Sequence, residues 1–143
     1  MDALERLVAQ QACTDVVTRY AVAVNAWDLD AFVSLFTPDA VWQRPRFPEL
    51  RGHAAIRAFM DSLPTPAERV LRHVNGGVLV ELIDDTTATV WSQTTVYESG
   101  PVAELPAPLK ADLVVEYRDR MVKIEGAWLI SRRDTTQVFK AGG

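Results

Sequence analysis

Cysteine is nearly absent from the 143-residue sequence, in which Cys13 is the single example. One thiol excludes an internal disulfide and any metal or redox site of the CxxC type. Apolar runs are only a few residues long, far short of the roughly 20 residues that a membrane-spanning helix needs. Basic residues are not in surplus, because the formal net charge is −4, whereas a dedicated nucleic-acid binder usually carries a basic face. We therefore expect neither nucleic acid nor a membrane as a partner.

Cofactor motifs are missing as well. The sequence contains no GxGxxG fingerprint and no glycine-rich loop followed by lysine, which are the signatures of nucleotide sites. His53 and His73 are the only histidines. They lie far apart without carboxylates at ligand spacing, whereas a zinc or iron site needs a cluster of such ligands. The sequence therefore predicts a protein without a metal ion or an organic cofactor.

The remaining composition is that of one folded domain. Hydrophobic residues make up 48% and charged residues 24%, which is typical of soluble globular proteins. The length suits a single domain over residues 1–143. The first residues, MDALERLVAQQ, alternate charged and apolar side chains and do not have the pattern of a signal peptide. We expect one domain, located in the cytoplasm.

The first part of the chain has helical spacing. Asp2 and Glu5 match a capping box, and apolar residues then recur with the period of a helix over about 3–25. Asp28 can cap a second, short helix that ends at Thr37, because the residue before a proline avoids helical dihedral angles. A short strand over 40–44 and a loop over 45–52 precede a third helix, which is marked by Ile56, Phe59, Met60 and Leu63.

The second part has the composition of strands. Segments over 70–83 and 86–98 are separated by Asp84-Asp85, and segments over 111–124 and 127–139 by Glu125-Gly126. Both separators are typical of tight turns, and Gly76-Gly77 predicts a bulge in the first segment. Helices followed by strands indicate an α+β fold, in which an antiparallel sheet packs on N-terminal helices in the order α-α-β-α-β-β-β-β.

Four segments together resemble a known family: RYAVAVNAWDLDAFVSLFTPDAVW, RGHAAIRAF, RHVNGG and YRDRMVKIEGAWLISRR. The resemblance is to the SnoaL-like branch of the nuclear-transport-factor-2-like (NTF2-like) superfamily and covers about residues 3–138. It implies a cone, in which a strongly curved sheet wraps around the helices and leaves a deep, mostly apolar pocket. The family includes bile-acid and scytalone dehydratases, hexachlorocyclohexane dehydrochlorinase, ketosteroid isomerase, polyketide cyclases and the small subunit of ring-hydroxylating dioxygenases.

The resemblance also implies a catalytic site. Its dehydratases and dehydrochlorinases place a polar residue on the first helix, an aspartate five residues later, and a histidine on the strand after the third helix. Here these positions are Tyr20, Asn25 and His73. The implied chemistry is removal of a substrate proton by His73, while Tyr20 donates a hydrogen bond to a developing oxyanion or leaving group. Asn25 departs from the pattern, because an amide can orient the imidazole or bind a substrate oxygen but supplies no negative charge.

Further residues are candidates for binding substrate in the pocket. Alternation along the strands places Leu71 on the same face as His73, and puts Tyr117 on an apolar face that should look into the cone. Trp42 is a candidate pocket wall. Arg44 and Arg46 flank Pro45 at the expected rim, where they either bind an anionic or carbonyl-bearing substrate or remain solvated charges.

Several polar residues have a structural alternative. Asp119 shares the strand face of Tyr117 and is either a catalytic carboxylate or one half of an ion pair with Arg132 or Arg133. His53 is expected on the surface or in the first turn of the third helix. A single histidine on a strand, such as His73, is itself often a hydrogen-bonded structural residue.

Three functions fit these expectations. The first is a cofactor-free enzyme of lyase, dehydratase, isomerase or cyclase type, with His73 as general acid or base and a hydrophobic cyclic or aromatic substrate. The second is a non-catalytic carrier of an apolar ligand, and the third is an accessory subunit that resembles the small subunit of the dioxygenases. Because the outer face of a curved sheet is usually covered by a partner, we also expect a homo-oligomer, a dimer or a trimer.

Overall fold

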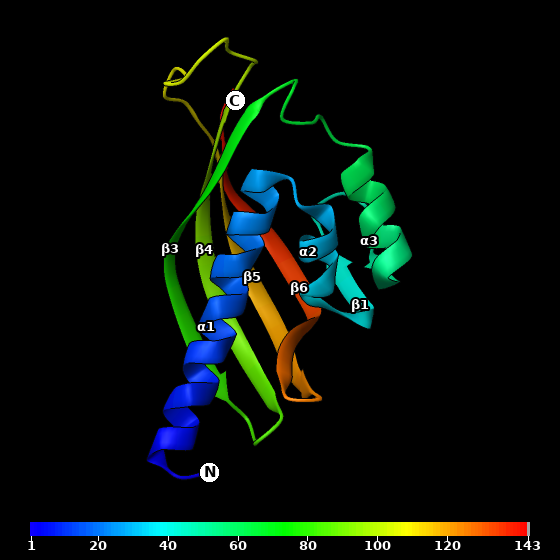
Figure 1. Cartoon of the computed structure of the whole chain (residues 1–143), viewed down its shortest axis with the longest axis vertical. Helices are drawn as coiled ribbons and strands as arrows, with labels where there is room; N and C mark the ends of the chain where they lie inside the picture. Colours follow the sequence, from blue (N-terminus) through cyan, green and yellow to red (C-terminus); the bar gives the residue numbers. More distant parts are fainter. Residues whose placement is uncertain (143) are drawn as a thin grey trace.

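The computed structural model describes residues 1–142 and begins with a long helix, α1 (Ala3–Ala26). The predicted capping box is confirmed. Asp2 Oδ1 accepts a hydrogen bond from the Glu5 backbone N–H at 2.8 Å, and Glu5 Oε2 accepts one from the Asp2 N–H at 2.7 Å. Trp27 ends the helix in the left-handed conformation, with a φ of 56°. In Figure 1, α1 lies across one face of the sheet.

Two shorter helices follow. Asp28 caps α2 (Leu29–Ser34) as predicted, because its Oδ1 accepts a hydrogen bond from the Ala31 N–H at 3.1 Å. His53 lies in the first turn of α3 (Gly52–Asp61), and its Nε2 donates to the Phe36 carbonyl oxygen at 2.8 Å. This hydrogen bond ties α3 to the first strand, so His53 has a structural partner and does not reach the cavity described below.

Six strands form one curved, open sheet in the order β2-β1-β6-β5-β4-β3. Four of the five neighbouring pairs are antiparallel, as predicted, whereas β1 and β6 are parallel, so the sheet is mixed. Parallel neighbours need a long crossover connection, and the chain between β1 and β6 provides one. The strands are β1 (Phe36–Gln43), β2 (Leu50–Arg51), β3 (Val70–Leu82), β4 (Thr87–Ser99), β5 (Ala111–Ile124) and β6 (Ala127–Lys140).

The beginning of the sheet differs from the prediction. β1 starts at Phe36 instead of residue 40, and its register against β6 shifts between Phe36 and Val41. The shifted segment contains Pro38, and a bulge tolerates proline because an unpaired residue needs no N–H. The loop predicted over 45–52 also contains the two-residue strand β2, which pairs with β1. Neither irregularity has a periodic signal in the sequence.

Both predicted hairpin turns are confirmed. Asp84 Oδ1 accepts two backbone N–H groups at 2.8 and 2.9 Å in the turn between β3 and β4. Glu125 and Gly126 join β5 to β6 with positive φ angles of 50° and 83°, which two-residue hairpins favour. The predicted bulge is confirmed as well, because the β3–β4 register shifts between Asn75 and Gly77.

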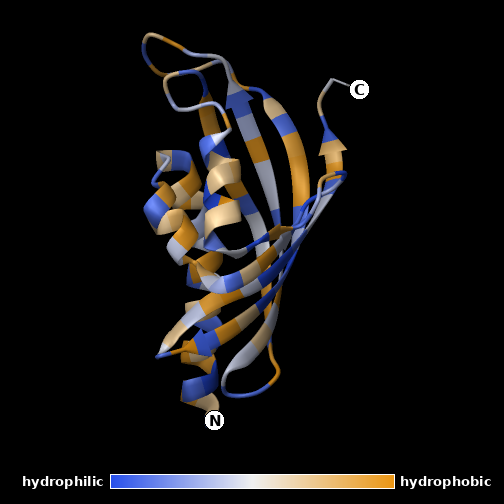
Figure 2. Cartoon of the chain, turned by 90° about the vertical axis from the view of Figure 1, so that its right-hand side faces the viewer, coloured by the Kyte–Doolittle hydropathy of each residue, from blue (hydrophilic) through white to orange (hydrophobic). Residues whose placement is uncertain are grey.

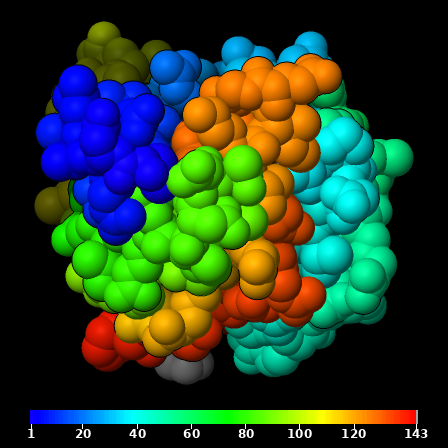
Figure 3. All heavy atoms as spheres, turned by 90° about the horizontal axis from the view of Figure 1, so that it is seen from below, coloured from blue at the N-terminus to red at the C-terminus, as the bar shows by residue number. Residues whose placement is uncertain are grey.

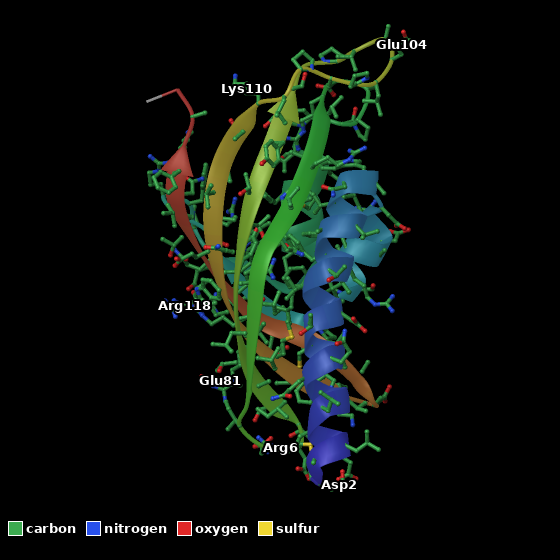
Figure 4. The ribbon with its side chains drawn as sticks, turned by 90° about the vertical axis from the view of Figure 1, so that its left-hand side faces the viewer. Asp2, Arg6, Glu81, Glu104, Lys110 and Arg118 are labelled. Atoms are coloured by element: carbon green, nitrogen blue, oxygen red, sulfur yellow. The ribbon has the colours of Figure 1, made fainter. Side chains whose placement is uncertain are left out.

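The helices cover only the concave face of the sheet (Figure 1), and hydrophobic and hydrophilic residues alternate along the strands (Figure 2). Arg118 and Glu81 project from the opposite face, away from the helices (Figure 4). Trp128 belongs to the buried core, as predicted, and so does Cys13. Burial raises the pKa of Cys13 to about 11, so its thiol stays protonated and unreactive. Of the helices in residues 1–142, none combines the length and the apolar character that crossing a membrane requires.

The two ends of the cone differ. At the end that carries the N-terminus, α1, the β3–β4 turn and the β5–β6 hairpin pack closely together (Figure 3). At the opposite end, the loop that contains Glu104 and Lys110 extends beyond the strands (Figure 4). The cavity lies toward this second end, because its lining includes Trp27, just after α1, and Glu98, near the end of β4.

Candidate active site

A cavity of about 270 Å³ lies between the helices and the concave face of the sheet. Its volume is near the lower end of the range for small-molecule sites, roughly 300–1,000 Å³. The lining is mostly apolar and aromatic, with a few charged side chains. The lining includes Tyr20, Trp42, Arg44, Phe47, Phe59, Arg69, Leu71, His73, Glu98, Asp112 and Tyr117.

Tyr20 and His73 both line this cavity. Tyr20 lies on the buried face of α1 and His73 on β3, and their ring centroids are 6.2 Å apart in an edge-to-face arrangement. Leu71, two residues before His73 on the same strand face, lines the cavity as well. The structure therefore brings together residues that are far apart in the sequence, because α1 packs along β3.

Asn25 holds the backbone of β3 and does not line the cavity. Its Oδ1 accepts a hydrogen bond from the His73 backbone N–H at 2.7 Å, and its Nδ2 donates to the His73 carbonyl oxygen at 3.5 Å. The same Oδ1 lies 3.4 Å from Nδ1 of the imidazole. This long contact occupies the Nδ1 side of the ring, and Nε2 has no hydrogen-bond partner among the described residues. Asn25 therefore contacts both the backbone and the ring of His73.

The imidazole of half-buried His73 is neutral at physiological pH. Burial lowers the pKa of His73 from 6.5 to about 4, and the positive charges of Arg133 and Arg69 contribute to the same shift. A carboxylate at position 25 would oppose this shift, because an opposite charge favours the protonated ring. The amide of Asn25 supplies no such charge. A neutral imidazole can accept a proton or donate a hydrogen bond, and until it is protonated it places no charge beside an apolar ligand.

An ion pair is buried beneath Tyr20. Arg133 on β6 donates from Nε and Nη2 to the two carboxylate oxygens of Asp119 on β5, both at 2.7 Å, and both side chains are fully buried. The guanidinium carbon lies 4.1 Å from the ring centroid of Tyr20 and 3.9 Å from that of Tyr117. Of the two roles that the sequence left open for Asp119, the structure shows the ion pair, and its partner is Arg133.

The protonation states of the groups in this cluster follow from their burial and from the ion pair. Burial raises the pKa of Tyr20 and of Tyr117, so both hydroxyl groups stay protonated and can donate hydrogen bonds. Burial lowers the pKa of Arg133, but the carboxylate of Asp119 more than offsets this effect and the pKa is raised. The arginine remains charged, and its positive charge contributes to the lowered pKa of His73.

Trp42 and Tyr117 are walls of the cavity. Trp42 is held in place by a hydrogen bond from its indole Nε1 to Thr135 Oγ1 at 3.1 Å. The ring of Tyr117 lies 5.7 Å from that of Tyr20, centroid to centroid. Both side chains are buried, and their positions are those that the sequence predicts for pocket-lining aromatic residues.

Arg44 and Arg46, which were expected together at the rim, lie in different environments. Arg44 lines the cavity and is only 8% exposed. Arg46 has a left-handed backbone with a φ of 64° and an exposed side chain that does not line the cavity, and its Nη2 donates to Gln137 Oε1 at 3.1 Å. Arg44 therefore remains a candidate ligand-binding residue, whereas Arg46 does not.

Arg133 is the residue of this site that sequence alternation could not identify. Strict alternation along β6 places Arg132 on the same face as Trp128 and Ile130. The β5–β6 register skips Ser131, and this extra residue exchanges the two faces for the remainder of the strand. Arg133 consequently points into the core, and Arg132 lies on the outside.

The curved sheet around N-terminal helices, with a cavity at one end, is the architecture of NTF2-like proteins. The family model of the SnoaL-like domain matches residues 5–134, so the chain belongs to this family.

Three solved structures share the fold. A scytalone dehydratase-like protein from Novosphingobium aromaticivorans DSM 12444 is 20% identical, with a TM-score of 0.83 over 99% of this chain and 92% of its own. Hexachlorocyclohexane dehydrochlorinase LinA-type3 from Novosphingobium barchaimii LL02 is 15% identical, with a TM-score of 0.80 over 99% and 97%. A ketosteroid isomerase-like protein from Erwinia carotovora atroseptica SCRI1043 is 18% identical, with a TM-score of 0.72 over 88% and 93%. At these identities the likeness shows a common fold.

Proposed function

We propose that the protein is a cofactor-free enzyme in which His73 transfers a proton to or from a small, hydrophobic ring compound. One observation carries this proposal: a neutral imidazole, held through its backbone and its Nδ1 side by Asn25, faces an apolar cavity beside the hydroxyl-bearing ring of Tyr20. The similar structures named as dehydratase-like, dehydrochlorinase and isomerase-like proteins support a lyase, isomerase or cyclase type of reaction.

The proposed step begins with the free lone pair of His73 Nε2. It removes a proton from a substrate carbon next to a carbonyl group, and the C–H electron pair moves into the carbonyl to form an enolate. Tyr20, whose hydroxyl group stays protonated, donates a hydrogen bond to the oxygen that gains charge. In an isomerisation, the imidazolium of His73 then returns the proton to another carbon. In an elimination, the enolate re-forms the carbonyl, its carbon–carbon electron pair makes a new double bond, the bond to the leaving group on the next carbon breaks, and the imidazolium protonates that group.

The low pKa of His73 limits the kind of C–H bond that can react. A base with a pKa of about 4 is weak, so it can remove only a proton that the substrate itself acidifies. Arg133 disfavours the imidazolium, and its own charge is balanced by Asp119. We therefore expect a substrate in which an electron-withdrawing group lies next to the reacting carbon.

Hydrogen–deuterium exchange tests the proposed step without the natural substrate. 2-Tetralone is an apolar bicyclic ketone with acidic α protons, and in D2O the exchange of these protons can be followed by NMR. We expect the wild-type protein to accelerate exchange, and His73→Gln to lower the protein-dependent rate by about 100-fold, the lower range for loss of a general base. His53→Gln changes the other histidine, outside the cavity, and should keep the wild-type rate. Equal rates for wild type and His73→Gln would contradict the proposal.

A non-catalytic carrier is the second candidate. The observation that favours it is the amide at position 25, because Asn25 leaves His73 uncharged and without a carboxylate partner. A carrier would bind an apolar ligand in the same cavity, with no exchange above the buffer rate in the tetralone experiment. The accessory-subunit alternative expects a collapsed pocket, and the open volume of about 270 Å³ does not favour it.

A further inference from the structure

The cavity contains a buried arginine without a carboxylate partner. Arg44 is 8% exposed, yet it forms no ion pair with any residue of the described chain, 1–142. Its Nη2 donates to the Pro48 carbonyl oxygen at 3.1 Å, and its Nε is buried without a hydrogen-bond partner. A buried charge is ordinarily paired, since desolvation of an unpaired charge is costly.

Aromatic rings lie over this guanidinium, and of its in-plane N–H groups only Nη2 has a hydrogen-bond partner among the described residues, the Pro48 carbonyl oxygen. The guanidinium carbon lies 4.0 Å from the ring centroid of Phe59, 4.9 Å from that of Phe47 and 5.8 Å from that of Trp42. Contact with a ring face stabilises the charge, but it satisfies none of the N–H groups, which lie in the plane of the guanidinium. That planar arrangement of donors matches the two oxygens of a carboxylate.

None of the described carboxylates lies within ion-pair distance of Arg44, and two of those nearby are paired with other arginines. Glu49, five residues further along, binds Arg51 at 2.6 Å and Arg132 at 3.1 Å. Glu98, which lines the cavity, pairs with Arg69 at 3.3 Å. Asp112 lines the cavity without an ion pair and is half-buried.

Arg133, the second buried arginine, differs from Arg44 in having a counter-ion within the chain. Arg133 receives an internal counter-ion, Asp119, with two hydrogen bonds of 2.7 Å. Arg44 receives none, although it is the one of the two that lines the cavity. Because Arg44 lines the cavity, a bound ligand can supply the counter-ion that the described chain does not.

We propose that Arg44 binds the carboxylate of the substrate, so that the substrate is an apolar ring compound with one acidic group. This inference deepens the proposed function, because the same cavity holds His73. The ring of Trp42 is 6.5 Å from that of Tyr20, which is 6.2 Å from His73, centroid to centroid. A ring compound anchored at Arg44 thus lies against Trp42 and Tyr20, with its reactive carbon directed toward His73.

Binding of a matched pair of probes tests the assignment. 1-Naphthoate and its neutral amide, 1-naphthamide, have the same ring and nearly the same shape, and quenching of tryptophan fluorescence reports occupation of the cavity that Trp42 lines. We expect the acid to bind at least 10-fold more tightly than the amide, the fold-change of one charge-assisted hydrogen-bonded contact. Arg44→Gln should reduce this ratio to less than about 3-fold. Arg46→Gln removes the same charge outside the cavity and should retain the wild-type ratio.

Two further measurements separate the possible outcomes. Affinity of the wild-type protein for the acid should fall as salt is raised while affinity for the amide stays constant, a result that does not depend on whether Arg44→Gln folds. His73→Gln should keep the acid preference even though it loses exchange activity. Equal binding of acid and amide by wild type, or an equal loss of preference in Arg44→Gln and Arg46→Gln, would overturn this inference. Failure of the exchange experiment alone would overturn only the proposed function.

Discussion

Replacement of Asn25 by aspartate places an anion against the candidate base. Asn25 Oδ1 already accepts the His73 backbone N–H at 2.7 Å and lies 3.4 Å from Nδ1 of the imidazole. Aspartate keeps the same number of heavy atoms, so its carboxylate should occupy the same position. Its second oxygen would face the His73 carbonyl oxygen, to which Asn25 Nδ2 now donates at 3.5 Å, and this repulsion should cost some stability.

The size of the expected effect follows from the distance. An opposite charge within about 4–6 Å raises the pKa of a histidine by roughly 1–3 units, and the distance of 3.4 Å is inside that range. The wild-type pKa of His73 is about 4. In Asn25→Asp we therefore expect a pKa of about 5–7, which restores the ordinary value for histidine at the upper limit.

NMR titration of the imidazole ring protons measures this pKa directly. The protein has only two histidines, so the ring signals of His73 need to be distinguished from one other set, that of His53, which donates to a backbone carbonyl oxygen outside the cavity. Asn25→Leu is the matched control, because it keeps the approximate shape and adds no charge. An unchanged His73 pKa in Asn25→Asp, or an equal rise in Asn25→Leu, would refute the interaction between the two side chains.

Two further experiments measure stability and a third measures assembly. Asp119→Asn leaves Arg133 as a buried unpaired charge and should lower the free energy of unfolding by about 3–5 kcal/mol; the double variant Asp119→Leu, Arg133→Met should recover most of this loss in urea titrations, and a loss below 1 kcal/mol would show that the pair is not buried. Between pH 6.5 and 4 the unfolded chain binds a proton that folded His73 does not, so the wild type should lose up to about 3 kcal/mol more stability on acidification than His73→Gln; equal losses would show an ordinary pKa. Light scattering at micromolar concentration should give a multiple of the 15.9 kDa monomer, most simply a dimer, and a monomeric mass would contradict the expected assembly.

The fold could be predicted largely because its local signals are strong. Capping at Asp2 and Asp28, the turn at Asp84 and the hairpin at Gly126 each depend on residues within a few positions, and all four are confirmed. The parallel pairing of β1 with β6 depends on two segments more than 80 residues apart, and no local pattern specifies it. From the sequence, Pro38 predicts the end of a helix, whereas in the structure it lies within β1. Proline interrupts a helix but does not indicate whether the chain continues as a strand.

Part of the candidate site could also be predicted from the sequence. Tyr20, Trp42, Leu71, His73 and Tyr117 line the cavity, where alternation and the family resemblance placed them. The orientation of Arg133 depends on one extra residue in β6, and alternation fails beyond such a bulge. The burial of Arg44 depends on rings from a loop and from α3 that close around it, and the role of Asn25 depends on how α1 packs against β3. These are tertiary contacts between distant segments.

The pH dependence of α-proton exchange in 2-tetralone tests the assignment of His73 as a neutral base most directly. If His73 is the base, the protein-dependent rate should rise with pH through about 4 and then stay level toward pH 8, because only the unprotonated imidazole accepts a proton. In Asn25→Asp the rising limb should move to higher pH by the same amount as the NMR pKa. A midpoint near 6.5 in the wild type, or a profile that is the same in His73→Gln, would show that this imidazole is not the group that removes the proton.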